Sequence, residues 1–470
     1  MLSRRSALLG ALSSYVALPH RLWAQPTSVA PGEKPPPVTI LRVERRGIEV
    51  NGKPASALGI RQPDGMQGLV TEVGRRFRVR VDNALDAPTL IHWHGMAPPW
   101  RQDGVPGISG PPIAPGASAE YDFPLRFGGT FWMHSHEGLQ EQSLLAAPLI
   151  IRDARNPPAQ QEATIMLADF SFTPAAQIYE ELRKKHAAPG LRAKKGEVRR
   201  PDLNDVRYDA YLANDRTLDD PEVVRAEKGG LFRLRVINAS AASNMWIDLG
   251  EISGELIAVD GQSIHPHRAS RFPIAIAQRA DIRLQLPKAS GAWPVLFKAE
   301  GSTGQSGIIL VAGDGAVAKI SDQGEMQPAI GLEMEAQLRA MGKTSDTAVS
   351  RVEMLMLTGG GSDYAWGLNG MSSMHDVLFS VREGERYQVM FHNMTSMAHP
   401  MHLHGHYFKV VNINGTAIDG ALRDTVLVPV DGMVTIQFDA DNPGTWAFHC
   451  HHLYHMNAGM MGAIAYQNAA

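Results

Sequence analysis

The C-terminal part of the chain contains the stretch His449-Cys450-His451-His452-Leu453-Tyr454-His455-Met456-Asn457-Ala458-Gly459-Met460. One cysteine with two histidines and a weakly bound axial methionine is the ligand set of a blue-copper electron-transfer site. Adjacent residues of a strand point to opposite faces, so His449 and His451 are not expected to bind the same metal as Cys450. The stretch therefore predicts two metal sites that are joined through one short strand.

Three further histidine clusters agree with this prediction. They are His92-Trp93-His94, His134-Ser135-His136 and His399-Pro400-Met401-His402-Leu403-His404. Ten of the 18 histidines are candidate metal ligands in these four clusters, and Cys450 is the only cysteine. One such pair arises readily by chance, because most histidines are surface or core residues. The combination of all four clusters instead indicates a set of metal sites.

These motifs resemble those of the multicopper oxidase family, which includes laccases, copper-resistance oxidases, ferroxidases and bilirubin oxidases. The resemblance covers nearly the whole mature chain. Residues 138–142 and 455–460 look most like the bacterial CopA-type copper-resistance oxidases. Asp103 after the first HxHG and the segment Arg423-Asp424-Thr425-Val426 also match family patterns. The resemblance implies an enzyme that holds four copper ions and reduces dioxygen to water.

The resemblance also assigns ligands to individual residues. Cys450, His399 and His455 are expected to bind a mononuclear blue copper, with Met460 as the weak axial ligand. The other eight histidines suit a trinuclear cluster: His92 and His402 on its single copper, and His94, His134, His136, His404, His449 and His451 on its coupled pair. Electrons are expected to pass from the blue site through Cys450 to His449 and His451.

Asp103 is the candidate proton donor or relay beside the cluster, and a loop-capping role before Gly104 is the alternative. Some family members carry a second acid directly after the last ligand histidine, but that position is Met456 here. This substitution leaves the second proton route open.

The electron donor is predicted to be a phenol or Cu(I). Phenols are expected to give up electrons at an exposed edge of His455. Thioether sulfur favours Cu(I), so the third-domain methionines suggest a Cu(I) site near the blue copper, unless they only fill gaps in the core. These methionines are Met371, Met374, Met394, Met397, Met401, Met456 and Met461. The alternatives are a ferroxidase, for which no carboxylate cluster is obvious near His399 or His455, and an exported copper-binding scaffold without turnover.

Composition limits the classes of protein and partner. The 470 residues, 20% charged and 44% hydrophobic, fit a soluble globular protein of about three domains. A net charge of −3 gives no reason to expect nucleic acid or an anionic membrane as a partner. No apolar run reaches the roughly 20 residues needed to span a bilayer. A monomer is expected.

The N-terminus predicts export. Residues 1–24 resemble a twin-arginine signal, with Arg4-Arg5 before an apolar run, and a plain secretory signal is the alternative. Export by this route predicts a periplasmic protein.

Short alternating runs at residues 77–81, 120–123, 231–237 and 386–391 predict strands. The fold is therefore expected to be all-β, with three cupredoxin-like Greek-key β-sandwich domains at 36–155, 160–315 and 352–467 and a linker at 316–351 that includes helical spacing at 332–341. The middle domain, which lacks HxH motifs, is expected to be a spacer and a wall. Within it, residues 175–186 predict an exposed helix, and the basic run at 192–200 predicts a solvated loop.

Overall fold

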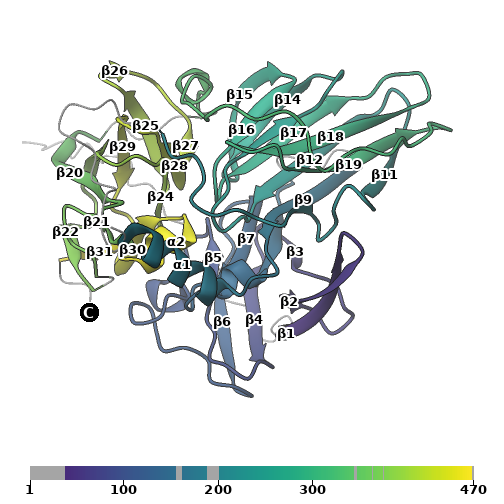
Figure 1. Ribbon diagram of the computed structural model, residues 1–470. Helices are drawn as coiled ribbons and strands as arrows, with labels where there is room; N and C mark the ends of the chain where they lie inside the picture. The colour runs from purple at the N-terminus through teal and green to yellow at the C-terminus, as the bar shows by residue number, and fades with distance from the viewer. Residues whose placement is uncertain are drawn as a thin grey trace, which may run out of the picture. The chain divides into compact units, whose positions relative to one another are not determined.

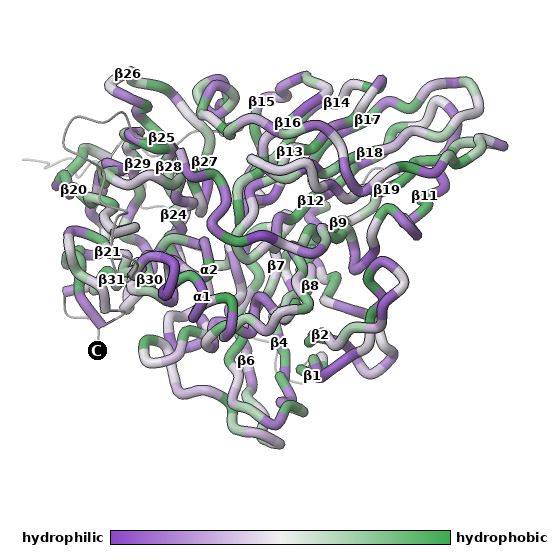
Figure 2. Tube along the Cα trace, viewed as in Figure 1, coloured by the Kyte–Doolittle hydropathy of each residue, from purple (hydrophilic) through white to green (hydrophobic). Residues whose placement is uncertain are grey.

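The computed structural model describes residues 37–154, 161–187, 201–342, 347–361, 364–373 and 375–467. The predicted export signal, the basic run at 192–200 and Met374 lie outside the described residues. Residues Val38–Ala470 form one compact unit, and its strands are arranged in six sheets (Figure 1). Figure 2 shows hydrophilic and hydrophobic residues alternating along many of these strands.

Three strands repeat the same sequence pattern and the same pairing. They are β4 (Arg76–Asn83), β12 (Leu231–Asn238) and β23 (Arg386–Asn393), and they contain three of the predicted strands. Each pairs in parallel with the first strand of its domain, which is β1 (Thr39–Val50), β9 (Gln161–Phe170) or β20 (Val349–Gly359). The sheets form three cupredoxin domains, each a two-sheet sandwich, which confirms the predicted fold class.

The first domain has one sheet of order β2-β1-β4-β6 and another of order β3-β8-β7-β5. Its remaining elements are β2 (Lys53–Arg61), β3 (Leu69–Glu72), β5 (Ile91–His94), η1 (Trp100–Gln102), β6 (Ser118–Pro124), β7 (Gly129–Ser135), η2 (Gln140–Ser143) and β8 (Ala146–Arg152). Aromatic side chains fill the space between the sheets, where Phe77 stacks on Phe123 with ring centroids 4.8 Å apart. The predicted strand at 120–123 lies in β6.

The second domain has sheets of order β10-β9-β12-β17-β14-β15 and β11-β19-β18-β13-β16. Its remaining strands are β10 (Ala210–Ala213), β11 (Glu222–Ala226), β13 (Met245–Asp248), β14 (Gly254–Val259), β15 (Gln262–Ala269), β16 (Arg271–Ile274), β17 (Arg279–Gln285), β18 (Gly291–Ala299) and β19 (Gln305–Ala312). A separate apolar core fills the domain.

The predicted helix of the second domain is confirmed as α1 (Ala175–Ala187). Glu180 and Lys184 form an i,i+4 ion pair of 3.6 Å on its outer side. The prediction that the helix is exposed holds for one face only, because Ile178 and Leu182 are buried in the core of the third domain. Their spacing places both side chains on the same helix face, so α1 covers part of a neighbouring domain.

The segment between the second and third domains runs along the second domain. Three bridges, Glu300↔Gln327, Gly304↔Gln323 and Ile264↔Ala340, attach it there. The helical spacing at 332–341 yields only the short η3 (Glu335–Gln337), because this backbone pairs with the second domain instead. At η3, Glu335 accepts a hydrogen bond of 2.8 Å from Nε of Arg423 in the third domain.

The third domain has sheets of order β21-β20-β23-β29-β25-β26, with β27 beside β25, and β22-β31-β30-β24-β28. Its remaining elements are β21 (Trp366–Leu368), β22 (Val377–Val381), β24 (His399–Leu403), β25 (Phe408–Ile413), β26 (Thr416–Ala417), β27 (Leu422–Arg423), β28 (Thr425–Val428), β29 (Met433–Asp439), β30 (Thr445–Cys450), α2 (Leu453–Asn457) and β31 (Met461–Tyr466). Among the described residues, no helix is long and apolar enough to cross a membrane.

Candidate metal centres

The sulfur of Cys450 lies beside two imidazoles in the third domain. Cys450 ends β30, His399 begins β24 and His455 lies in α2. The Sγ atom is 3.5 Å from Nδ1 of His399 and 3.8 Å from Nδ1 of His455, and the two nitrogens are 3.2 Å apart. Met460 is buried in the same core cluster. The three donor atoms are close enough together to hold one metal ion.

His455 is enclosed on all sides. Its ring stacks with Trp366 at 3.9 Å and with His452 at 3.6 Å between centroids, and its Nε2 lies 3.6 Å from Oδ2 of Asp205. The prediction that an edge of His455 is exposed is wrong, since the residue is 0% exposed. The edge of His455 is covered by Asp205, which belongs to the second domain. The sequence around His455 therefore does not predict that this edge is covered.

Asp205 is shared between two histidines. Its Oδ1 lies 3.2 Å from Nε2 of His452, and the hydroxyl of Tyr364 donates a hydrogen bond to Oδ2. Burial alone would raise the pKa of Asp205. The charges of His452 and His455 and their hydrogen bonds to Asp205 have the larger effect and hold its pKa well below the usual range. The sequence analysis missed both Asp205 and His452. His452 stands directly beside the ligand motif, whereas Asp205 carries no local signal.

A second group of side chains combines residues of the first and third domains. It consists of His92, His94, His134, His136, His402, His404, His449 and His451, all buried. Strand register aligns them: His92 is opposite His134 in β5 and β7, and His402 is opposite His449 in β24 and β30. Nε2 of His449 lies 2.9 Å from Nε2 of His404. We call these eight residues the histidine cluster.

In the histidine cluster, one ring nitrogen of most residues is held by an oxygen outside the cluster. Nδ1 of His92, His402 and His449 meets the backbone oxygen of Asp103, Asp424 and Cys450 at 2.8, 2.9 and 2.9 Å. Nδ1 of His404 meets Oδ2 of Asp103 at 2.7 Å, and Nε2 of His94 meets Oδ1 of Asp424 at 3.2 Å. Metal-ligating histidines are oriented in this way by carboxylates and carbonyls.

The opposite ring nitrogens fit copper ligation. Nε2 of His92, His134, His402 and His451 and Nδ1 of His94 are buried without a hydrogen-bond partner in the described protein. Buried polar atoms are otherwise nearly always paired. Burial, followed by the neighbouring histidines, also lowers the pKa of His94 and His402 well below its usual value. These imidazoles are therefore neutral, as a metal ligand must be.

Comparisons with known proteins identify the family. Models described as multicopper oxidase match residues 45–156, 161–313 and 346–470. Multicopper oxidase MmcO of Mycobacterium tuberculosis is 31% identical, and the match covers 84% of this chain and 80% of that protein. The chain belongs to the multicopper oxidase family. A copper resistance protein A homolog of Pseudomonas syringae pv. tomato is 26% identical over 98% of both chains. The crystal structure of Fet3p, a multicopper oxidase that functions in iron import, has a TM-score of 0.77 at 18% identity over 92% of this chain and 91% of that one, a likeness of fold alone.

Besides Asp424, two buried acids contact the histidine cluster of this multicopper oxidase. Asp103 follows η1, and its carboxylate lies 2.7 Å from Nδ1 of His404 and 3.3 Å from Nδ1 of His92. The carboxylate of Asp103 therefore points to the histidine cluster, and not to the loop before Gly104 that it would cap in the alternative role. The second acid, Glu141 in η2, lies 3.0 Å from Nδ1 of His134. Burial, and then the charge of Asp169, raise the pKa of Glu141 well above its usual value. In the sequence, Glu141 was noted only within residues 138–142, which resemble the CopA-type oxidases, and no role was predicted for it.

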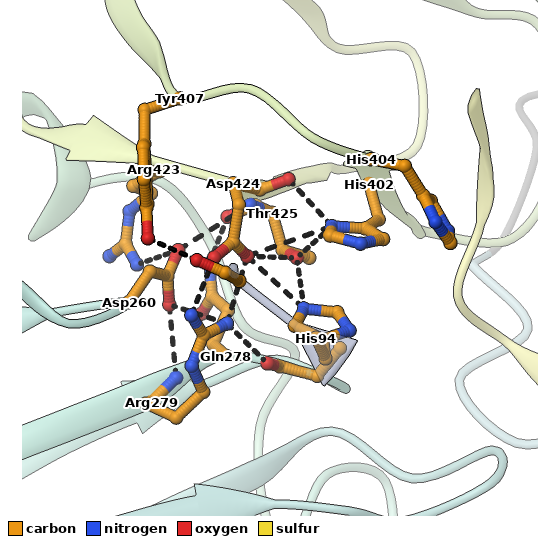
Figure 3. Close-up of polar contacts among 12 residues, drawn as sticks. His94, Asp260, Gln278, Arg279, His402, His404, Tyr407, Arg423, Asp424 and Thr425 are labelled. Atoms are coloured by element: carbon orange, nitrogen blue, oxygen red, sulfur yellow. Dashed lines mark hydrogen bonds and ion pairs between the residues drawn. The ribbon is translucent and has the colours of Figure 1, made fainter. Parts of the chain in front are cut away.

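The middle domain is more than a spacer and a wall. Arg279 in β17 donates two parallel hydrogen bonds to Asp424 of the third domain, from Nη1 at 2.8 Å and from Nη2 at 2.5 Å. Figure 3 shows Asp424 between Arg279 and the imidazoles of His94 and His402. Both partners of this ion pair are 0% exposed. The predicted role is therefore incomplete: a domain without HxH motifs fixes the carboxylate that orients cluster histidines from the other two domains.

Proposed function

We propose that this multicopper oxidase takes single electrons from a donor near Cys450 and delivers them to the histidine cluster, where dioxygen is reduced to water. Bound copper supplies the one-electron redox chemistry. One observation carries the proposal. Cys450 stands between His449 and His451 in the chain, yet its sulfur joins the group with His399 and His455, while its two neighbours are among the buried cluster histidines. The chain itself is thus a covalent route between the two centres.

The ligand roles follow from this arrangement. Cys450, His399 and His455 hold a mononuclear copper, with Met460 as the axial residue. His92 and His402 hold the single copper of the cluster, and His94, His134, His136, His404, His449 and His451 hold its coupled pair. The unpartnered ring nitrogens support these roles, as does the buried position of Met460.

Because His455 is buried, the donor reaches it through other residues. A cavity of about 440 Å³ lies in the second domain beside the end of α1, and Asp205 is part of its wall. Asp205 also contacts His455. We propose that phenolic donors bind in this cavity and that their electrons pass by way of Asp205 and His455. Tyr208 and Tyr211, which also line the cavity, suit the recognition of an aromatic ring.

A cuprous donor is the second candidate, supported by the relationship to copper resistance protein A. The methionine site predicted near the blue copper is not part of it. Met397 and Met401 are buried in the apolar core, and Met461 is buried beside Val105, so these three side chains fill core gaps.

Asp103 is proposed to hold and pass protons to the histidine cluster, because its Oδ2 is within hydrogen-bond distance of His404. Glu141 occupies a comparable position at His134. It is proposed as the second acid that the sequence lacks after His455.

Two other functions are less well supported. A ferroxidase would need open carboxylates beside His455, but the side chain of Asp205 is buried and already engaged by His452 and Tyr364. A scaffold without turnover would not require the complete ligand set. Export to the periplasm remains part of the proposal, supported by the twin arginines of the sequence and the relationship to copper resistance protein A. A monomeric state is proposed with it.

The test is a side-by-side assay on the purified, copper-loaded protein. Oxygen uptake is measured with a phenol, with Cu(I) and with Fe(II) as the only donor, and metal content is determined on the same sample. We expect four coppers per chain, a blue absorption band and turnover of the phenol, of Cu(I) or of both. A single copper per chain, or oxygen uptake with Fe(II) alone, would contradict the proposal.

A further inference from the structure

The outer face of one third-domain sheet carries a group of methionines. In β20, Leu355 and Leu357 are buried in the core, so by strand alternation Met354 and Met356 point outward. Met354 is 53% exposed. In β23 the alternation of buried and half-buried residues is regular. Phe391 is buried in the core, which places its neighbours on the outer face.

Strand register brings these side chains together. Met354 is directly opposite Met390, and Met356 is opposite His392, between β20 and β23. His392 is in turn opposite Met433 of β29. Neighbouring strands lie about 4.8 Å apart, and directly opposed Cβ atoms about 5 Å apart. Met356, His392 and Met433 therefore form one row across three strands, with Met354 and Met390 in the adjacent row. We call these five residues the methionine face.

A sixth residue extends the methionine face. Met394 continues the outward alternation of β23, its N–H donates to the carbonyl of Leu357 at 3.1 Å, and it is 39% exposed. Met394 is also one of the methionines singled out in the sequence. The strands β20 and β29 lie at the left of Figure 1.

The composition of the methionine face is not that of an ordinary surface. Methionine makes up 21 of 470 residues, so five positions taken at random would hold well under one. Exposed apolar side chains gathered on adjacent strands usually mark an interaction site. The next row contains Gln388 and Gln437, whose side chains bond each other at 3.0 Å. Lys409 of β25 is opposite Gln437 in that next row and forms an ion pair with Asp419. The two rows of the methionine face itself contain no acid, lysine or arginine on β20, β23 and β29.

We propose that the methionine face binds a soft monovalent cation, the cuprous ion, at a site separate from the Cys450 site and the histidine cluster. Thioether sulfur and imidazole are ligands suited to Cu(I), whereas Ca²⁺, Mg²⁺ and Mn²⁺ need oxygen ligands. Methionine has three rotatable bonds, so sulfurs from adjacent strands can turn toward one ion beside His392. An uncharged set of ligands also suits an ion of single charge.

The methionine face is separated from the Cys450 site by the core of the domain. Phe391 lies beneath it, and its ring is 5.6 Å from that of Phe448 in β30. Phe448 lies on the same strand as Cys450. A cation at the methionine face would therefore stand across the sandwich core from Cys450, and it can be removed by substitution without touching a residue of either proposed redox centre.

The test uses Ag(I), a soft monovalent ion that does not reduce the bound copper. Fully copper-loaded protein is titrated with silver nitrate in chloride-free buffer by calorimetry. The variant carries Met354→Leu, Met356→Leu, Met390→Leu and Met433→Leu, changes that keep side-chain volume and cost little in packing. The matched control carries Met66→Leu and Met341→Leu, at methionines that are 50% and 54% exposed outside the methionine face. Loss of partners around a ligand already costs about 10–100-fold in metal affinity, so loss of the ligands is expected to weaken Ag(I) binding by at least about 100-fold.

One equivalent of tightly bound Ag(I) in the wild type and the control, lost in the four-methionine variant, supports the site. Equal Ag(I) binding in all three proteins overturns it and leaves the face as an apolar surface. Zn(II) binding there as tightly as Ag(I) also overturns it, because it would indicate a site built on His392 alone. The blue band and phenol turnover must be unchanged in the variant. If the variant keeps the blue band and phenol turnover but no longer binds Ag(I), the lost binding belongs to the methionine face and not to the proposed oxidase centres.

Discussion

Replacement of Arg279 offers a direct test of the role of the middle domain. Arg279→Lys keeps the positive charge but loses the planar fork, so at least one of the two parallel bonds to Asp424 is lost. Hydrogen bonds between charged groups contribute about 1.5–3 kcal/mol each. Arg279→Met also removes the positive charge and leaves the Asp424 carboxylate buried without a compensating partner. This change is expected to lower the free energy of unfolding by about 3–5 kcal/mol.

The expected consequence is a loss of order at the histidine cluster. Oδ1 of Asp424 lies 3.2 Å from Nε2 of His94 and 3.6 Å from Nδ1 of His402, so both rings lose an orienting contact when the carboxylate moves. Loss of such supporting contacts lowers metal affinity by about 10–100-fold. Copper content is measured after dialysis against graded concentrations of a chelator, together with the blue absorbance. We expect cluster copper to be lost from Arg279→Lys at about 10–100-fold lower chelator concentration, while the blue copper is retained.

Arg233→Lys is the matched control. Arg233 and Asp281 form a similarly buried ion pair in the same domain, and neither is in the histidine cluster. A general loss of stability would affect both variants alike. Parallel loss of blue and cluster copper in Arg279→Lys, or copper retention equal to that of the wild type, would refute the proposed positioning role.

Three further outcomes are expected. Cys450→Ser should abolish the blue band while most cluster copper stays bound, because the thiolate contributes only to the mononuclear site. Absorbance and metal analysis measure this, and loss of all copper would argue against separate centres. His94→Ala or His451→Ala should leave the blue copper reducible but abolish oxygen uptake, and near wild-type uptake in either would remove that residue from the cluster. Asp103→Asn keeps size but removes the ionisable group, so stopped-flow measurements should show slower reoxidation by oxygen with little change in reduction of the blue copper; equal effects on both half-reactions would leave Asp103 a structural residue.

The sequence reveals ligands better than their surroundings. A strand that supplies two ligands to one site must place them at i and i+2, and this constraint leaves the visible HxH signature of His92 and His94 or of His134 and His136. The three repeated strands were likewise recognisable from alternation alone. The fold class and the metal-binding character of the chain could therefore be predicted.

The residues that orient the ligands leave no such signature. Asp205 and Arg279 each act through one carboxylate or guanidinium whose partner lies far along the chain, as for Arg279 and Asp424, which are 145 residues apart. Any acid in any loop satisfies the local chemistry equally well. The mistaken exposure of His455 has the same origin, because the covering carboxylate belongs to another domain. Likewise, the outward row of Met356, His392 and Met433 becomes visible only once strand register is known.

The distribution of these supporting residues links copper loading to domain assembly. The proposed ligands of the mononuclear site all come from the third domain, so that site can form when this domain folds. The histidine cluster draws its proposed ligands from the first and third domains, and Asp424, which contacts it, is held by Arg279 of the second. A ligand that binds only the assembled state stabilises that state in proportion to its concentration and affinity. Copper in the cluster is therefore expected to stabilise the three-domain arrangement, whereas copper at Cys450 stabilises mainly the third domain. The two centres should accordingly be lost at different stages of unfolding, with cluster copper leaving first.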